Sequence, residues 1–461
     1  MTLTPHYQDE NVTVYAGDCL DVLAELPDAS VDSVVTDPPY GLEFMGKEWD
    51  SFDDKAKRPK WRDGSESEAD AQYLAERASS FTRRFRRTPD AYVAGTPFQD
   101  WCEQWSRECL RVLKPGGHIL AFGGTRTWHR LAVAIEDAGF EIRDNIAWLY
   151  GSGFPKSLDV SKAIDAKLTT GGSAPKNIRQ RDMGDDYRPH RLAGTPDYGN
   201  GRMSRGADTD RDYSDAPGLH TEDAKRWSGW GTALKPAFEP VVVGRKPLSG
   251  TVAANVLAHG VGALNIDGCR VATQDGDYQH PGNNNAGVSM FGKVGRQVEP
   301  HTAGRWPSNV VVDEVAAQEI DRQSGVSVSG APRTERGKGG IWSDGNGIPC
   351  GPQYGDEGGA SRFFPTFKYQ AKAPTEERPT ANGVAHPTVK PVDLMRWLIR
   401  LVTPPGGTVL EPFAGSGTTA EACIHEHMKC IAIEREPDYL PLIVARLTKP
   451  MEIGFDFGQG A

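Results

Sequence analysis

The sequence predicts an α/β protein built on a doubly wound, mostly parallel sheet. Segments typical of strands and helices alternate over residues 11–40 and 98–151, and the alternation resumes over residues 386–447. In the last of these stretches a glycine-rich turn joins a strand to the following helix. Strands linked by helices of this length run parallel, because each helix crosses back over the sheet before the next strand begins.

The first half of this alternation can be assigned element by element. Apolar and β-branched residues predict strands over 12–15 and 31–36, with a short helix over 19–26 between them. A helix is expected near residues 98–113, where the sequence KPGG would end it. Three further elements are expected in order: a strand over 118–124, an amphipathic helix over 128–140 and a strand over 141–151.

A segment of different composition separates the two halves. Residues 151–235 contain few apolar residues and many Gly, Asp and Arg, which is typical of a long loop or a flexible segment. We therefore expect three regions: one α/β half over 1–159, an inserted region over 160–370 with a flexible part over 170–225, and a second α/β half over 371–461.

Composition excludes several classes of protein. The chain has 461 residues and a net charge of −10, so it is not a basic coat for nucleic acid, although a local basic face would still allow DNA binding. Its seven cysteines form no CxxC pair, which argues against a zinc site or a disulfide framework and favours a reducing cytoplasm. No apolar run approaches the roughly 18 residues of a membrane span.

The glycine-rich turn of the second half is a candidate ligand site. A strand over 408–410 leads into Gly415 and Gly417, a helix follows from about Thr418, and the next strand over 430–433 ends at Glu434. An acid at the end of the second strand can bind ribose hydroxyls. A P-loop would need Lys after the second glycine, and a dinucleotide site would need a third glycine. A nucleoside-type cofactor such as S-adenosylmethionine and a plain turn with a surface acid remain.

The sequence VVTDPPYGLEF ends the strand over 31–36 in an unusual way. Prolines end strands because they lack the N–H group that a ladder needs. Asp37, Pro38, Pro39 and Tyr40 therefore present a carboxylate, two rigid carbonyl groups and an aromatic ring at the end of a buried strand.

These two stretches together resemble the amino-specific DNA methyltransferases, which methylate adenine N6 or cytosine N4. Asp37-Pro38-Pro39-Tyr40 matches the catalytic motif of that family, and the run from Glu411 to Thr419 matches its cofactor motif. The catalytic motif comes first in the chain, which is the order of the permuted beta type. The resemblance implies a Rossmann-like, circularly permuted methyltransferase sheet with an inserted target-recognition region.

The resemblance also implies a cofactor and the residues that bind it. The cofactor is S-adenosylmethionine, and Glu411 stands where the family more often has Asp. The residues implied to bind the cofactor are Asp18, Cys19, Lys390, Glu411, Phe413, Gly415, Ser416, Gly417, Thr418 and Glu434.

The chemistry of methyl transfer to an exocyclic amine explains the catalytic motif. The lone pair of such an amine is delocalised into the ring, so two acceptors on its two N–H bonds are needed to draw it back. Asp37 supplies a carboxylate and Pro38 a carbonyl group that Pro39 holds rigid, and Tyr40 can stack on the base. The base must first be flipped out of the duplex.

Two further stretches are open between a functional and a structural role. FTRRFRRT, residues 81–88, fits contact with DNA phosphates or a solvated helix face. Trp148, Gly151, Gly153, Phe154 and Pro155 resemble a family segment near the base pocket, but a core tryptophan beside a turn explains them equally.

The predicted function is methylation of adenine N6 in double-stranded DNA, with no membrane partner. Asp at position 37 favours adenine, because cytosine-N4 enzymes more often carry Ser there. Open alternatives are cytosine N4, an RNA or a protein glutamine amide as methyl acceptor, and a non-catalytic DNA-binding module. A homodimer and a restriction endonuclease partner are also left open by the sequence.

Overall fold

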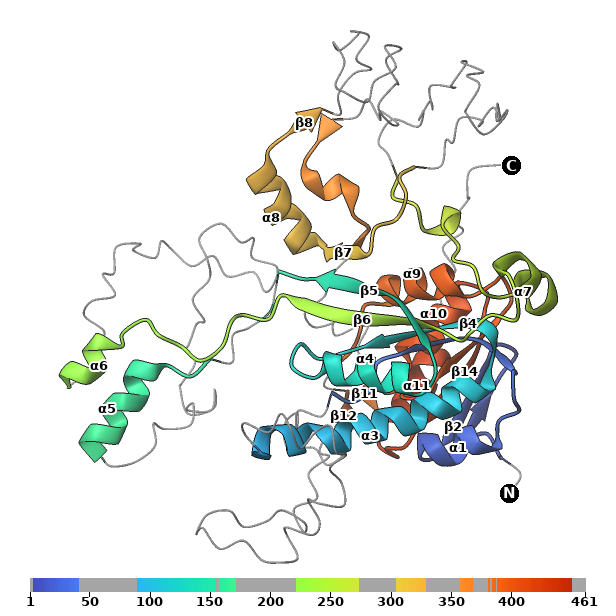
Figure 1. Cartoon of the computed structure of the whole chain (residues 1–461), viewed down its shortest axis with the longest axis horizontal. Coiled ribbons are helices and arrows are strands. Elements are labelled where there is room, and N and C mark those ends of the chain that lie inside the picture. Colours follow the sequence, from blue (N-terminus) through green and yellow to red (C-terminus); the bar gives the residue numbers. More distant parts are fainter. Residues whose placement is uncertain are drawn as a thin grey trace, which may run out of the picture. The chain divides into compact units, whose positions relative to one another are not determined.

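The structure of the chain is a computed structural model (Figure 1). The residues it describes are 3–40, 89–151, 153, 157–170, 221–272, 304–328, 357–367, 380–381, 384–386 and 388–449. The chain forms two compact units, of which the first comprises Met1–Ser152 with Ala237–Ala461 and the second Gly153–Pro236.

The described part of the first unit contains a ten-stranded sheet, in the order β1-β2-β14-β13-β3-β4-β6-β5-β7-β10. Within it the strands run parallel, except that β1 is antiparallel to β2 and that β6 is antiparallel to both β4 and β5. The predicted doubly wound, mostly parallel sheet is therefore confirmed. The strands are β1 Tyr7–Gln8, β2 Val12–Ala16, β3 Val31–Thr36, β4 Leu113–Phe122, β5 Glu141–Leu149, β6 Phe238–Arg245, β7 Val310–Asp313, β10 Thr366–Phe367, β13 Thr408–Glu411 and β14 Lys429–Glu434.

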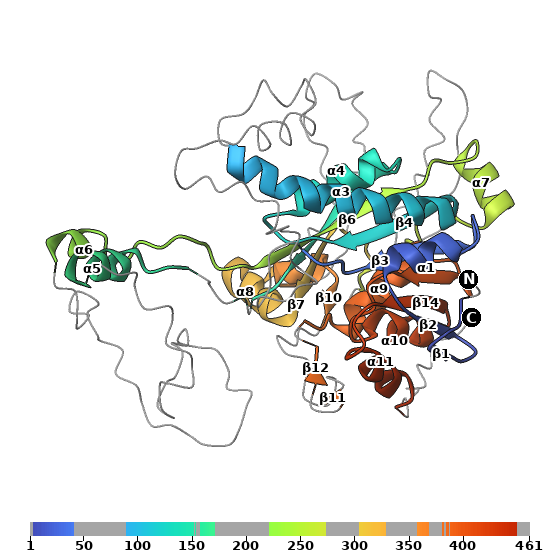
Figure 2. The same cartoon turned by 90° about the horizontal axis from the view of Figure 1, so that it is seen from below.

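Helices cover both faces of this sheet (Figure 2). One face carries α1 Cys19–Glu25, α3 Pro89–Val112 and α4 Trp128–Asp137, and the other carries α9 Val392–Val402, α10 Thr418–His425 and α11 Leu440–Leu447. Successive strand residues point to opposite faces. Val34 accordingly packs in the core beneath α1, α3 and α4, whereas Val35 packs in the core beneath α9, α10 and α11.

Two elements extend beyond their predicted bounds. Helix α3 was expected near residue 98 but begins at Pro89 and runs through Pro97. Burial of Trp105 in the core shows that tertiary packing here outweighs the hydrogen bond that a helical proline removes. Strand β4 was expected at 118 but begins at Leu113, because Leu113 pairs with Val31 before the register shifts between Val31 and Ser33.

Several short elements complete the first unit. They are α7 Val252–His259, α8 Glu314–Ser324, the 3₁₀ turns η5 Asp267–Cys269 and η6 Ala360–Phe363, and two small two-stranded sheets, β8 Ser327–Val328 with β9 Glu357–Gly358 and β11 Thr380–Ala381 with β12 Val384–Ala385.

The second unit is a small helical pair. It contains α5 Val160–Thr170 and α6 Glu222–Arg226. The Asp165 carboxylate accepts hydrogen bonds from both the backbone N–H and the hydroxyl of Thr221, the N-cap of α6. All of this unit except residues 153–159 lies within the predicted insert, but β6, β7 and β10 from the same predicted insert belong to the large sheet. The three-region division predicted from composition therefore differs from the division into compact units, and target recognition by residues 160–370 stays a prediction.

Some expectations fall on residues outside those described above. They are the basic stretch 81–88, Phe154, Pro155 and most of the segment 170–225. Among the described residues, no helix has the length and apolar character required to cross a membrane.

Candidate active site

Four acidic residues lie at the carboxyl ends of four neighbouring parallel strands. The strands β2, β14, β13 and β3 are adjacent and parallel. Asp18 follows β2, Glu434 ends β14, Glu411 ends β13 and Asp37 follows β3. In open parallel sheets this edge is where ligands bind. The sheet thus brings the catalytic motif and the glycine-rich turn, which are far apart in the sequence, to one edge.

The glycine-rich turn requires glycine at two positions. Gly415 and Gly417 have φ angles of +53° and +78°, in the left-handed region that other residues rarely adopt. A Cβ atom at Gly415 would also lie 3.0 Å from Nε2 of His386. The turn then leads directly into α10, with Gly417 as its N-cap, so backbone N–H groups face the sheet edge.

The Glu434 carboxylate is held against this turn. Its two oxygens accept hydrogen bonds from the backbone N–H groups of Gly415 and Glu436, both at 2.7 Å. Burial raises the pKa of the Glu434 carboxyl to about 7, although those N–H groups act in the opposite direction. An ionised carboxylate offers about four acceptor positions. Glu434 therefore keeps acceptor capacity beyond its two backbone partners.

The Glu411 carboxyl is buried and joins β3 to β13 and α10. It accepts hydrogen bonds from the Thr36 hydroxyl, the Thr419 hydroxyl at 2.6 Å and the Phe413 N–H at 3.0 Å. Burial raises its pKa to about 8, against the opposing effect of these donors. Thr36 immediately precedes Asp37, so Glu411 fixes the start of the catalytic motif. Its predicted contact with the cofactor stays a prediction.

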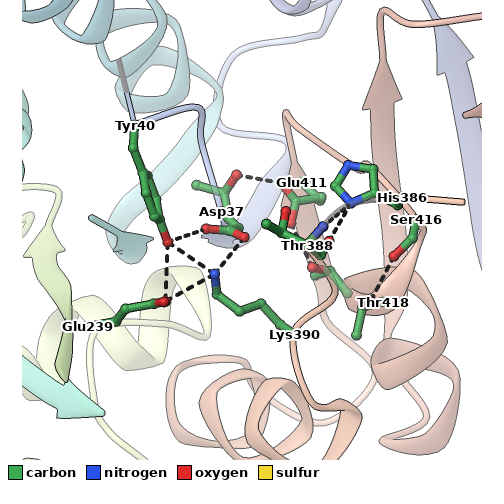
Figure 3. Close-up of polar contacts among 11 residues, drawn as sticks. Asp37, Tyr40, Glu239, His386, Thr388, Lys390, Glu411, Ser416 and Thr418 are labelled. Atoms are coloured by element: carbon green, nitrogen blue, oxygen red, sulfur yellow. Dashed lines mark hydrogen bonds and ion pairs between the residues drawn. The ribbon is translucent and has the colours of Figure 1, made fainter. Parts of the chain in front are cut away.

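Asp37 belongs to a network of four polar side chains (Figure 3). Its Oδ1 accepts a hydrogen bond from the Tyr40 hydroxyl at 2.8 Å, and its Oδ2 accepts one from the Lys390 ammonium at 2.7 Å. Glu239 of β6 completes the network, with its Oε2 3.3 Å from the Tyr40 hydroxyl and 3.2 Å from the Lys390 ammonium. Two carboxylates thus share the same two donors.

Both donors of this network keep their protons at neutral pH. Burial lowers the pKa of Lys390, but the carboxylates of Asp37 and Glu239 outweigh burial and leave the pKa above its usual value. Burial, followed by the charges of the same two carboxylates, holds the pKa of Tyr40 well above its usual value. The ammonium of Lys390 also lies 4.7 Å from the centre of the Phe122 ring. The site therefore combines two negative charges with one positive charge.

The rest of the catalytic motif is anchored to the backbone around it. Pro38 is buried, and Pro39 is half-buried. The carbonyl of Tyr40 accepts a hydrogen bond from the Thr127 hydroxyl at 2.8 Å. The Tyr40 ring lies close to Gly124, where an added Cβ atom would approach it to 3.1 Å. These contacts fix the direction of the motif after β3 ends.

The remaining predicted residues lie around the same edge, with local roles. Asp18 is the N-cap of α1 and accepts a hydrogen bond from Leu20 N–H at 2.9 Å. Burial raises the pKa of Cys19 to about 12, so its thiol is neutral. Phe413 packs on Trp105 of α3. The buried hydroxyls of Ser416 and Thr418 are hydrogen-bonded to each other at 3.2 Å.

Glu239 was not among the residues singled out from the sequence, and Lys390 makes a contact that the sequence did not predict. Lys390 was expected near the methionine end of a cofactor, whereas its ammonium contacts Asp37, and the cofactor contact stays a prediction. A lone acid at the start of an apolar strand could have drawn attention to Glu239. Trp148 is buried in the core against Phe122 and Tyr150.

The sequence is similar to a known protein family over more than half of its length. The N6_N4_Mtase family, described as DNA methylase, matches residues 31–182 and 276–445. The chain belongs to this DNA methylase family. Its predicted likeness to the amino-specific DNA methyltransferases is thereby confirmed.

Curated relatives of this DNA methylase include two enzymes of Haemophilus influenzae. The type II methyltransferase M.HindIII is 25% identical over 259 residues, which are 55% of this chain and 64% of M.HindIII. The type II methyltransferase M.HinfI is 25% identical over 150 residues, 30% of this chain and 31% of M.HinfI. The chain thus spans less than two thirds of the length of these relatives.

Two solved structures align with most of this chain at low sequence identity. The cytosine-N4-specific PvuII DNA methyltransferase aligns with a TM-score of 0.39 and 13% identity, covering 98% of this chain and 91% of that one. The M1.HpyAVI–SAM complex aligns with a TM-score of 0.35 and 14% identity, covering 95% of this chain and 99% of that one.

The side chains that the structure describes do not suggest a metal site in this DNA methylase. Among those residues, no three His, Cys, Asp or Glu side chains are grouped as a metal site would require.

Because the pKa of Glu411 is raised, we expect this residue to make the free energy of unfolding depend on pH, and we expect Glu411→Gln to remove that contribution. The folded protein binds the Glu411 proton more tightly than the unfolded chain does. The contribution of Glu411 to stability is therefore full below its unfolded pKa of about 4.5, and is lost as the pH rises through about 8. We expect the free energy of unfolding of Glu411→Gln, relative to wild type, to increase between pH 5 and 8. Urea denaturation at several pH values measures this, and a constant difference between the two proteins would contradict it.

Proposed function

We propose that this protein is a DNA methyltransferase that moves a methyl group from S-adenosylmethionine to adenine N6 of a flipped-out base. The observation that carries the proposal is the pairing of β3 directly with β13. This pairing sets Asp37 beside the glycine-rich turn, so a group bound at the turn and a base bound at Asp37 would meet. Family membership supports the same reaction class.

The residues around the turn fit a nucleoside cofactor. Glu434 has acceptor positions left for ribose hydroxyls, and the glycines at 415 and 417 allow the backbone to come close to a ligand. When bound, S-adenosylmethionine supplies a methyl group that its sulfonium charge has already activated. The remaining proposed cofactor residues, among them Asp18, Phe413, Ser416 and Thr418, lie at or behind the same edge.

The residues of the catalytic motif are proposed to activate and align the amine. The Asp37 carboxylate and the Pro38 carbonyl accept the two N–H groups, which returns the lone pair to nitrogen. Pro39 restrains the Pro38 carbonyl. The chain needs no covalent intermediate, because alignment of nitrogen, methyl carbon and leaving sulfur contributes most of the rate. The Tyr40 ring is proposed to support the base.

Adenine is the proposed target because residue 37 is an acid. A charged acceptor binds an N–H group about twice as strongly as a neutral one. Adenine and cytosine differ in ring size, but their exocyclic amines need the same acceptors. Methylation of cytosine N4 is therefore the alternative outcome of the test below.

The reaction is tested by methyl transfer from tritiated S-adenosylmethionine to duplex DNA, RNA and protein. We expect labelled duplex DNA, with N6-methyladenine found by mass spectrometry of its nucleosides. Asp37→Ala should reduce this transfer at least about tenfold, since the loss of one charge-assisted hydrogen bond costs about 1.5–3 kcal/mol, while cofactor affinity stays near that of wild type. Detection of N4-methylcytosine without N6-methyladenine would show that cytosine is the target base. Labelling of RNA or protein but not DNA would refute the proposal.

Cofactor binding should depend on pH through Glu434. The ionised carboxylate is the form that accepts both ribose hydroxyls, and its pKa is about 7 in the free protein. Affinity for S-adenosylmethionine should therefore fall as the pH drops below 7 and level off above about 8. Glu434→Gln should weaken binding by about 1.5–3 kcal/mol at pH 8 and flatten the pH dependence.

Calorimetry at pH 6, 7 and 8 checks this, with Glu436→Gln as the control. The Glu436 side chain is 37% exposed, and its backbone N–H donates to Glu434. The substitution leaves that N–H in place, so affinity at pH 8, where Glu434 is ionised, should be nearly unchanged. At lower pH the loss of the Glu436 charge, which helps to raise the pKa of Glu434, should favour binding rather than weaken it. Equal affinity of wild type and a folded Glu434→Gln protein would refute the role of Glu434.

We further propose that residues 160–370 determine the DNA sequence that is methylated. The segment lies between the catalytic and cofactor stretches. It contains most of the second compact unit, from residue 160 to its end at Pro236. Replacing it by the matching segment of a relative should change the methylated sequence and leave the methylated atom the same. Sequencing of methylated DNA measures this, and a motif that follows residues 1–159 instead would refute it.

A further inference from the structure

Both oxygens of Asp37 are already engaged before any base is present. Oδ1 accepts from the Tyr40 hydroxyl at 2.8 Å, and Oδ2 accepts from the Lys390 ammonium at 2.7 Å. A carboxylate that must accept an N–H group from a target amine has to loosen at least one of these contacts. The Lys390 ammonium also donates to the Tyr40 hydroxyl oxygen at 3.0 Å, but a neutral oxygen does not replace the charge of a carboxylate. A displaced ammonium or hydroxyl therefore needs another acceptor, because a charge without a counter-charge or a hydroxyl without an acceptor is costly in a partly buried site.

Glu239 is placed to be that acceptor for both donors. Its Oε2 lies 3.2 Å from the Lys390 ammonium and 3.3 Å from the Tyr40 hydroxyl, slightly farther than the oxygens of Asp37. The Lys390 side chain is only 10% exposed, whereas the side chains of Asp37 and Glu239 are 24% and 22% exposed. The ammonium is thus largely buried between two carboxylates, each of which remains partly accessible to solvent.

The position of Glu239 is set by a strand rather than by a loop. Residue 239 belongs to β6, which lies between β4 and β5, and it pairs with Trp148 of β5. Trp148 is itself buried in the core. Strand β6 pairs with β5 at Glu239 itself and with β4 from Val241 onward, which keeps the Glu239 backbone fixed while the side chains around Asp37 exchange partners. Figure 3 shows Glu239 approaching the network from the side opposite to Glu411.

We propose that Glu239 is a positioning residue for methyl transfer, a role that rests on the proposed function. It retains the Lys390 ammonium and the Tyr40 hydroxyl when Asp37 turns to the N–H group of the target amine. Without the charge of Glu239, Asp37 is the remaining carboxylate of this network that can pair with Lys390. The Asp37–Lys390 ion pair then competes with the target amine for the oxygens of Asp37. Glu239 thereby leaves Asp37 free to accept while Lys390 stays charged and in place.

The test compares single-turnover methyl transfer by wild type and Glu239→Gln at saturating cofactor and DNA. Gln keeps the size and an acceptor oxygen but removes the charge. We expect the rate constant to fall about 10- to 100-fold, the kinetic equivalent of one charge-assisted hydrogen bond. Affinity for S-adenosylmethionine and the thermal midpoint should stay close to wild type, and Glu239→Asp should recover part of the rate.

A double mutant separates positioning from a merely structural role. With Lys390→Met the competing ammonium is gone and only the Tyr40 hydroxyl is left for Glu239 to retain, so adding Glu239→Gln should lower the rate by a clearly smaller factor than it does in the wild-type background. A structural role of Glu239 would lower the rate by the same factor in both backgrounds. Glu141→Gln is the matched control. Glu141 lies on the neighbouring strand β5 and pairs with Arg245 at 2.6 Å, away from the network, so its loss should change the rate by less than about twofold.

The outcomes distinguish this inference from the function on which it rests. A wild-type enzyme that methylates DNA, with Glu239→Gln within about twofold of it, overturns the inference alone. Loss of cofactor affinity in Glu239→Gln also overturns it, because Glu239 would then act in binding. Wild-type protein that binds the cofactor but transfers no methyl group to DNA overturns the proposed function and the inference with it.

Discussion

The arrangement of the site depends on one buried carboxyl group. Glu411 accepts hydrogen bonds from Thr36 at the end of β3, from Thr419 in α10 and from the backbone of Phe413. These groups lie on both sides of the junction between the catalytic motif and the glycine-rich turn. The two stretches would otherwise be joined at this point by the few backbone pairs of β3 with β13. The short path between Asp37 and the turn is a consequence of this junction.

The site residues predicted from local patterns, which the structure brings to one edge of the sheet, share one property. Asp37 directly follows an apolar strand, Glu434 ends one, and Gly415 lies in the turn after another, and parallel strands bring such ends to one edge. Strand β3 over residues 31–36 was predicted with its observed bounds. Knowledge of the strand order was not needed for this, because any order of adjacent parallel strands puts the carboxyl ends on the same side.

What the sequence could not predict depends on contacts between distant segments. Glu239 reaches the site because β6 inserts antiparallel between β4 and β5, and no local pattern states where a strand inserts. Lys390 precedes α9 and contacts Asp37 only through the folded arrangement. The early start of α3 has the same origin, since the burial of residues such as Trp105 outweighs the local effect of Pro97.

The order of strands in the sheet has a consequence for how the chain matures. β2 and β3 are neighbours in the sequence, yet β14 and β13 lie between them in the sheet. Residues 12–36 are synthesised more than 370 residues before residues 408–434, and until then the two facing edges of β2 and β3 have no partners. Unpaired strand edges invite wrong pairing, and closure over such a sequence distance is slow. The nascent protein must therefore keep the gap between β2 and β3 open, or protected, until β13 and β14 have been synthesised.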